Sequence, residues 1–140
     1  MPKFDVRRFS RNLHRGHGGR LGIVYHDHGD DWVELALPWS AEQVGDPASG
    51  TIAAGPVLTL MDTATSLAVW AKRDRFAPHA TLDLRLDHLR PPVAGHVLIG
   101  RGECHHLDAS VAFVRGIAHH GDLDDPVARV AGTFMLTDAA

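Results

Sequence analysis

The sequence predicts an α+β domain in which one long central helix is wrapped by a curved antiparallel sheet of about six strands. Three observations lead to this prediction. The core of the stretch 50–73 reads as a hydrophobic helix that begins near Pro56, strand-like segments joined by tight turns precede and follow it, and neither a repeat nor a linker divides the chain. A helix that is apolar on nearly all sides needs a sheet curved around it, and tight turns favour antiparallel pairing.

Composition restricts the classes of function. A chain of 140 residues most simply forms one domain, 1–140, with a real core. The net charge of -3 argues against nucleic acid as the main partner, and no apolar run approaches the roughly 18 residues of a membrane span. The single cysteine, Cys104, rules out an intrachain disulfide framework. Because the basic N-terminus lacks the apolar core of a signal peptide, we expect a cytoplasmic protein.

The first nineteen residues predict a short amphipathic helix and a basic arm. Apolar residues recur near helical spacing at Phe4, Val6, Phe9 and Leu13. Six of the fourteen Lys and Arg residues fall in the first twenty positions, which suits either a solvated face or an anionic partner. Glycines then break the helix, and we interpret 17–19 as a loop.

Six segments are typical of strands, namely 21–28, 31–37, 79–89, 96–106, 109–119 and 127–137. In 79–89 strict alternation places Leu82, Leu84 and Leu86 on one face, and Thr81, Asp83, Arg85 and Asp87 on the other. The segment 40–49 reads as a polar loop. His26 and His28 share a strand face, but the sequence supplies no third ligand, so we predict no metal site. The pairs 105–106 and 119–120 are expected to face solvent.

The central helix carries the chemistry. Pro56 suits a first helical position, and one acid, Asp62, interrupts the apolar run. The small residues Ala53, Ala54 and Gly55 lead into the helix and leave backbone N–H groups uncovered. Free N–H groups at a helix N-terminus can bind a carbonyl oxygen, and an acid two turns further on could act as base or nucleophile on the same carbonyl carbon. The alternative is a structural acid, bonded to a hydroxyl of its own helix or to a neighbouring strand.

Arg90 is a candidate for anion binding. It ends the alternating strand directly before Pro91 and Pro92, where a rigid turn can hold a guanidinium toward solvent. Arginine makes bidentate contacts to phosphate, so we predict that Arg90 binds the phosphates of coenzyme A. A surface ion pair with Asp83 or Asp87 is the competing interpretation.

Three segments together resemble a known family. The entry GTIAAGPVLTLMDTA, the strand ATLDLRLDHLRPP and the close ARVAGTFML are similar to hotdog-fold acyl-CoA thioesterases of the phenylacetate-degradation type, from about residue 32 to 137. Gly50, Gly55, Leu60 and Asp62 match the family pattern. Ala53 stands where the family often has His, and Ala54 where it often has Gly.

The resemblance implies a role for each matching residue. Asp62 matches the catalytic carboxylate, which acts as general base or nucleophile. The N–H of Ala54 matches the oxyanion donor, Thr81 matches a hydroxyl near the attacking water, and Ala53 and Gly55 border the bound substrate. It also implies a homodimer with sites across its interface, able to pair into a dimer of dimers, and no cofactor beyond coenzyme A as part of the substrate.

These features together predict an acyl-CoA thioesterase, a thioester hydrolase that acts on a small or medium acyl group, aromatic ones included. Two alternatives stay open. A non-catalytic dimer that binds acyl-CoA or an acyl carrier is favoured by Ala53, which lacks the family imidazole. An acyl-thioester dehydratase or hydratase would need an acid and a histidine in one site, and His79 and His88 are the nearest candidates.

Overall fold

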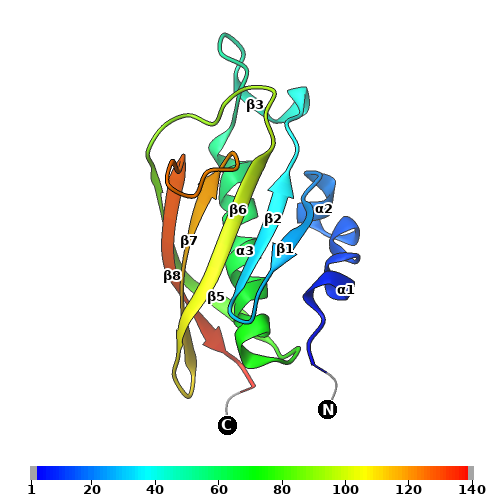
Figure 1. Ribbon diagram of the computed structural model, residues 1–140, viewed down its shortest axis with the longest axis vertical. Helices are drawn as coiled ribbons and strands as arrows, with labels where there is room; N and C mark the ends of the chain where they lie inside the picture. Colours follow the sequence, from blue (N-terminus) through cyan, green and yellow to red (C-terminus); the bar gives the residue numbers. More distant parts are fainter. Residues whose placement is uncertain (1–2, 139–140) are drawn as a thin grey trace.

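The computed structural model describes residues 3–138; residues 1–2 and 139–140 of the predicted domain lie outside the described residues. Its main sheet has six antiparallel strands in the order β1-β2-β6-β7-β8-β5. The strands are β1 (Val24–His28), β2 (Trp32–Leu37), β5 (His79–His88), β6 (Leu98–Leu107), β7 (Val111–His119) and β8 (Ala128–Leu136). The sheet wraps the long helix α3 (Ala54–Arg73), as Figure 1 shows, so the predicted α+β hotdog arrangement is confirmed.

Helix and sheet approach closely because small residues line the sheet where α3 crosses it. A Cβ added at Gly102 would lie 2.5 Å from the backbone of Ala64 and Thr65, and one at Gly100 would lie 2.7 Å from Leu60. No real side chain fits at such distances, so the two glycines let the helix lie directly on β6. No helix among residues 3–138 is both long and apolar enough to cross a membrane.

The helix begins earlier, and is less buried, than the sequence predicted. It starts at Ala54, so Pro56 is its third residue rather than its first, which costs nothing because first-turn N–H groups lack helical partners anyway. It ends at Asp74, which adopts a left-handed conformation with φ of 54°. One side faces away from the sheet, and Leu58 on that side is 44% exposed.

The N-terminal segment forms α1 (Val6–Ser10), the 3-10 turn η1 (Leu13–Arg15) and α2 (His17–Arg20), which flank the β1 side of the sheet (Figure 1). Val6 is buried against the core, so the amphipathic helix is confirmed. The predicted loop at 17–19 is wrong, because these residues form a helical turn. Gly19 packs so tightly on the preceding turn that a Cβ would lie 2.1 Å from the Leu13 carbonyl oxygen.

The segment 40–49 is more regular than the expected polar loop. It forms the 3-10 turn η2 (Ala41–Gln43) and strand β3 (Val44–Asp46), which pairs with β4 (Thr51–Ile52). The N–H of Ala53 donates to the carbonyl of Gln43 over 2.8 Å. This hairpin therefore fixes the backbone that enters α3.

One expected solvent-facing histidine is buried. His119 is 3% exposed, and its Nε2 lies 3.0 Å from a carboxylate oxygen of Glu34, which is 8% exposed. The N–H of Gly121 donates to His119 Nδ1, so Nε2 carries the proton that bonds Glu34. Arg101 lies 3.7 Å from the other oxygen of Glu34. Because His119 and Arg101 satisfy the Glu34 carboxylate, both faces of β2 can be buried. A strand with one buried face would instead alternate buried and exposed residues.

Candidate active site

The structure brings Asp62 and Thr81 together. Asp62 lies on the open side of α3, and the Thr81 hydroxyl on β5 donates to its Oδ1 over 2.9 Å. The second carboxylate oxygen stays available, and Asp62 is half-buried rather than enclosed. An acid held by one hydroxyl, whose other oxygen has no hydrogen-bond partner among residues 3–138, can accept a proton or attack an electrophile.

A β-bulge at Leu82 makes this contact possible. Thr81 pairs with Phe134 and Asp83 with Thr133, so Leu82 opposes no residue of its own. Paired residues share a sheet face, and Phe134 is buried beneath the sheet, so Thr81 faces the helix. The predicted faces of Thr81 and Leu82 are therefore wrong: the extra residue reverses the alternation, and Leu82 is 53% exposed.

The N-terminus of α3 is an open donor site. Within residues 3–138, no acceptor bonds the N–H groups of Ala54 and Gly55, and both residues are exposed. A Cβ added at Gly55 would meet nothing within 4 Å, so the space above this turn is free. Unpaired N–H groups at the positive end of a 20-residue helix suit an oxygen that gains negative charge.

Ala54 and Asp62 of one chain cannot act on one carbonyl. Eight residues separate them on a single helix, and an α-helix rises about 1.5 Å per residue, which places them about 12 Å apart along the axis. The expectation of one carbonyl served by both groups within a chain is therefore wrong. Within one chain the helix N-terminus and the Asp62 carboxylate are therefore two separate groups.

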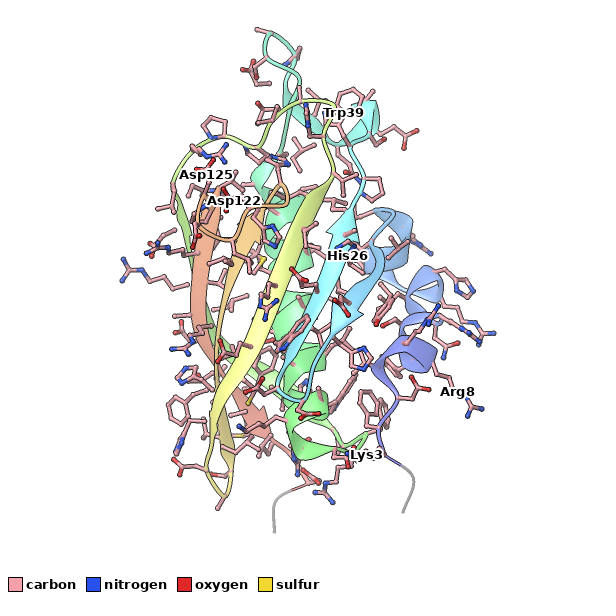
Figure 2. All side chains as sticks on the ribbon, in the orientation of Figure 1. Lys3, Arg8, His26, Trp39, Asp122 and Asp125 are labelled. Atoms are coloured by element: carbon pink, nitrogen blue, oxygen red, sulfur yellow. The ribbon has the colours of Figure 1, made fainter. Side chains whose placement is uncertain are left out.

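Ala54 and Arg90 line the same cavity. It measures about 480 Å³ and lies between β4, the start of α3 and the segment after β5, including Pro91 and Pro92. Arg90 bonds through Nη2 to the carbonyl and carboxylate of Asp125, each over 3.1 Å, and its buried Nε has no partner among residues 3–138. The expected ion pair with Asp83 or Asp87 is thus replaced by one with Asp125. Figure 2 shows Asp125 toward the end of the molecule where α3 begins.

Ala53 lies at the N-terminal end of α3. It caps α3 with an extended backbone and makes no side-chain cap bond. A Cβ added at Gly45 would lie 3.0 Å from the Cβ of Ala53, so hairpin and helix entry are in close contact. The methyl group supplies no hydrogen bond, and any donor here is a backbone N–H.

A second polar pair lies one turn beyond Asp62. Ser66 Oγ is 2.6 Å from His79 Nε2, and His79 is the residue two before Thr81 on β5. Burial, and then the nearby Arg73 guanidinium, lower the pKa of His79, so its imidazole is neutral at neutral pH. The sequence analysis considered Ser66 only as one of the helix hydroxyls that could form a hydrogen bond with Asp62. The four-residue spacing from Asp62 was the available signal, but the bulge that turns His79 to the helix was not visible.

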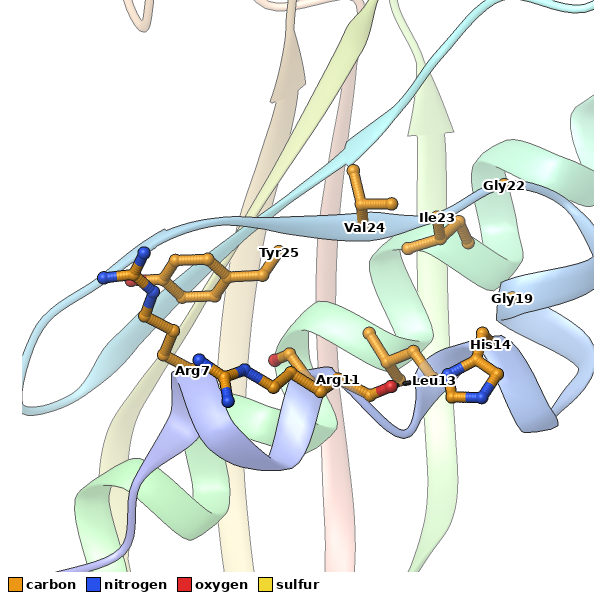
Figure 3. A pocket seen from close by; sticks show the side chains of 10 residues that line it. Arg7, Arg11, Leu13, His14, Gly19, Gly22, Ile23, Val24 and Tyr25 are labelled. Carbon is orange, nitrogen blue, oxygen red and sulfur yellow. Dashed lines mark hydrogen bonds between the residues drawn. The ribbon is translucent and has the colours of Figure 1, made fainter.

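Other reactive groups lie apart from this arrangement. Among residues 3–138, no three His, Cys, Asp or Glu side chains are grouped to hold a metal ion. Burial raises the pKa of Cys104 to about 11, so its thiol is a poor nucleophile. A cavity of about 390 Å³ between α1 and β1, with Arg7, Arg11 and Tyr25 on its wall (Figure 3), contains none of the predicted site residues.

The chain matches a known protein family over more than half of its length. The model of the Thioesterase superfamily matches residues 49–126, which include α3, β5, β6 and β7. The matched part thus contains every predicted site residue. No curated protein matches the chain significantly.

Solved structures are similar over nearly the whole chain. A Pseudomonas aeruginosa protein is 34% identical, with a TM-score of 0.81 over 93% of this chain and 95% of its own. A putative thioesterase from Ralstonia eutropha, described as related to phenylacetic acid degradation, is 25% identical, with a TM-score of 0.72 over 91% and 98%. A thioesterase from Haemophilus influenzae shares the fold at 20% identity, with a TM-score of 0.81 over 96% and 94%.

Proposed function

The chain belongs to the Thioesterase superfamily and is a thioester hydrolase, and on this premise we propose that it hydrolyses a small or medium acyl-CoA, aromatic ones included, to the free acid and coenzyme A. The observation that carries the proposal is the Asp62–Thr81 contact on the open side of α3. We also expect the enzyme to work in the cytoplasm.

In the proposed reaction Asp62 acts as general base or as nucleophile. As base, its free oxygen takes a proton from water while the water oxygen bonds the carbonyl carbon and the C=O electron pair moves onto oxygen. Collapse of this intermediate breaks the C–S bond, and the coenzyme A thiolate takes the proton back from Asp62. As nucleophile, the carboxylate bonds the carbonyl carbon, the C–S bond breaks with release of the coenzyme A thiolate, which takes a proton from solvent, and water then opens the resulting anhydride to the free acid and Asp62. Label in Asp62 after a single turnover in ¹⁸O water would establish the anhydride route with water attack at the Asp62 carbonyl, since the general-base route sends all of the label to the free acid.

The 12 Å separation supports a homodimer. Because Ala54 and Asp62 of one chain cannot share a carbonyl, the N–H of Ala54 in one copy is proposed to serve the Asp62 of a second copy. Leu58, one turn before Asp62 on α3, and Leu82, next to Thr81 on β5, are both exposed leucines. Among residues 3–138, β5 pairs only with β8 and so leaves one edge open. An exposed edge beside apolar side chains favours pairing across a two-fold axis, and two such dimers could pair further.

Light scattering tests this assembly. The expected result is at least twice the 15.2 kDa of one chain at micromolar concentration. A monomer that still hydrolyses thioesters would contradict the shared site.

Coenzyme A is proposed to occupy the cavity that Ala54 and Arg90 line. A carbonyl over the helix N-terminus places the thiol arm toward Pro91 and Pro92. Arg90 also lines this cavity, and its side chain is about one-third exposed. A phosphate could take its guanidinium from Asp125, because phosphate carries more charge than a single carboxylate.

The alternative of a binding protein without turnover has one favouring observation, the methyl side chain of Ala53. The alternative of a hydratase is weaker. His79 lies near Asp62, but its Nε2 bonds Ser66 and its Nδ1 is buried, so neither nitrogen is free to exchange a proton with substrate.

A panel of acyl-CoA thioesters, read by release of free thiol, is the decisive experiment. We expect turnover on at least one small, medium or aromatic acyl group. Tight binding without thiol release would favour the binding protein. Loss of the double-bond absorbance of an enoyl thioester, without thiol release, would favour the hydratase.

A further inference from the structure

Ser66 differs from every other hydroxyl residue of α3. Thr59, Thr63 and Thr65 each donate back to the carbonyl four residues earlier, over 3.1, 2.7 and 2.8 Å. Such back-bonding is the usual way in which a helix satisfies a hydroxyl in its interior. Ser66 makes no such bond and instead turns outward to His79. The Ser66 hydroxyl therefore contacts β5 rather than the backbone of its own helix.

His79 is firmly placed to hold it. Its ring packs between Trp70, at 4.8 Å between centroids, and Phe134, at 5.1 Å. His79 and Thr81 are two residues apart and so share a face of β5, and the bulge at Leu82 turns that face toward α3. Two contacts therefore run side by side between helix and strand, Thr81 to Asp62 and His79 to Ser66.

The environment of His79 fixes which atom carries its proton. Nδ1 is buried and has no hydrogen-bond partner among residues 3–138, and the nearest cation is Arg73. A proton on Nδ1 would be an unpaired buried donor repelled by that cation, whereas a bare lone pair there is stabilised by it. We assign the proton to Nε2, which donates it to Ser66 Oγ. The hydroxyl proton of Ser66 is then free for another acceptor.

The Ser66 hydroxyl lies next to Asp62 on the surface of α3. Side chains four residues apart on a helix have Cβ atoms about 5–6 Å apart, so a thioester held at Asp62 would also lie beside Ser66. If Asp62, or a water molecule that it activates, attacks the carbonyl carbon, the carbonyl oxygen would lie within hydrogen-bond distance of Ser66. Ala53 provides no side-chain donor, so the oxygen needs a second donor besides the N–H of Ala54 in the second copy.

We propose that Ser66, aligned by His79, donates its hydroxyl hydrogen bond to the thioester carbonyl oxygen and stabilises the negative charge that forms there. The inference rests on the proposed function. Ser66 forms no covalent bond: its proton stays on Oγ while the C=O electron pair moves onto the oxygen and returns when the C–S bond breaks. His79 is a positioning residue, because it acts only through Ser66.

Kinetics of Ser66→Ala give the first test. Loss of one oxyanion donor lowers kcat by about 10²–10³-fold, and KM should change little because the bond strengthens mainly in the transition state. Thr63→Ala is the matched control, since that hydroxyl bonds only the helix backbone and its loss should leave kcat near normal. A folded Ser66→Ala enzyme with near-normal kcat would overturn the proposal.

Binding of two inert probes gives a test that needs no turnover. Phenacyl-CoA carries a carbonyl oxygen that phenethyl-CoA lacks, and the two are otherwise alike. The wild type should prefer phenacyl-CoA, and Ser66→Ala should reduce this preference by about 3–10-fold, the range for one hydrogen bond. A structural role would weaken both probes equally and leave the preference intact, which would refute the proposal.

His79→Leu tests the positioning role, because leucine fills the space between Trp70 and Phe134 without an N–H donor. We expect the probe preference to fall in this variant and to be partly restored in His79→Gln, which keeps a donor. An unchanged preference in His79→Leu would remove His79 from the proposal. If the wild type cleaves no thioester, the thioesterase assignment fails, yet the two probes still decide whether Ser66 binds a carbonyl.

Discussion

Replacing Asp62 by Asn isolates the chemistry of the carboxylate from its structural contacts. The Thr81 hydroxyl donates to Oδ1 over 2.9 Å, and the amide oxygen of Asn can accept the same bond. No basic side chain among residues 3–138 lies within ion-pair distance of Asp62, so removal of its charge strands no buried partner. The fold should therefore tolerate the change.

The magnitude follows from the role. An amide can neither accept a proton from water at neutral pH nor act as a carboxylate nucleophile. General base help contributes about 10²–10⁴ in rate, so kcat should fall by at least about 10²-fold, or about 2.7 kcal/mol in activation free energy. Binding of phenacyl-CoA should change little, since the donors at Ala54 and Ser66 remain.

The assay combines thiol release, thermal unfolding and probe binding on one preparation. Asp30→Asn is the control, because it removes an exposed carboxylate from the β1–β2 turn, which lies beside the C-terminal end of α3 rather than beside Asp62, and should leave all three unchanged. If Asp62→Asn keeps its melting temperature and turns over at a near-normal rate, Asp62 is not part of the mechanism. A joint loss of stability and probe binding would instead assign it a structural role.

Three further predictions follow from particular contacts. Arg90→Ala should raise KM for a coenzyme A thioester in a salt-sensitive way and spare an N-acetylcysteamine thioester, while Asp125→Asn should lower KM; an unchanged KM at low salt for Arg90→Ala would count against the phosphate contact. Gly102→Ala should cost about 1–3 kcal/mol in urea unfolding, because its Cβ would meet the α3 backbone at 2.5 Å, whereas Gly55→Ala, with open space, should not; equal stabilities would refute the close packing. Since burial lowers the pKa of His79, the unfolded chain binds that proton more readily, so stability should fall as pH drops below about 6.5. His79→Leu should lack this part of the decline between pH 7.5 and 5.5 in thermal unfolding, and identical profiles would contradict it.

Local patterns in the sequence were sufficient for the elements of the fold. The apolar run and the basic residues before Pro78 placed the end of α3 near Arg73, where the structure has it. Its beginning was placed at Pro56 instead of Ala54, because proline is accepted throughout a first turn and so marks the start only to within a few residues. The glycines of β6 are typical of either bends or points of close approach, and Gly102 is a point of close approach.

Features that depend on distant pairing were not visible. Glu34 and His119 are 85 residues apart, and His119 was expected to face solvent because its partner could not be identified. The bulge at Leu82 has the same origin. It arises from the register between β5 and β8, whereas alternation within β5 alone favoured a regular strand.

The bulge and the helix together explain why sequence spacing was a good guide to the site residues and a poor guide to the site. A regular β5 would turn Thr81 and His79 away from α3, and neither Asp62 nor Ser66 would have its partner on the strand. Spacing along α3 suggested one site containing Ala54 and Asp62, yet the helical rise that orients both also holds them about 12 Å apart. A rigid helix can contribute both its N-terminal N–H groups and its acid to catalysis only if the two groups act in different sites. Two antiparallel copies of such a helix satisfy this requirement twice, which is the geometric reason to expect two equivalent sites in a symmetric dimer.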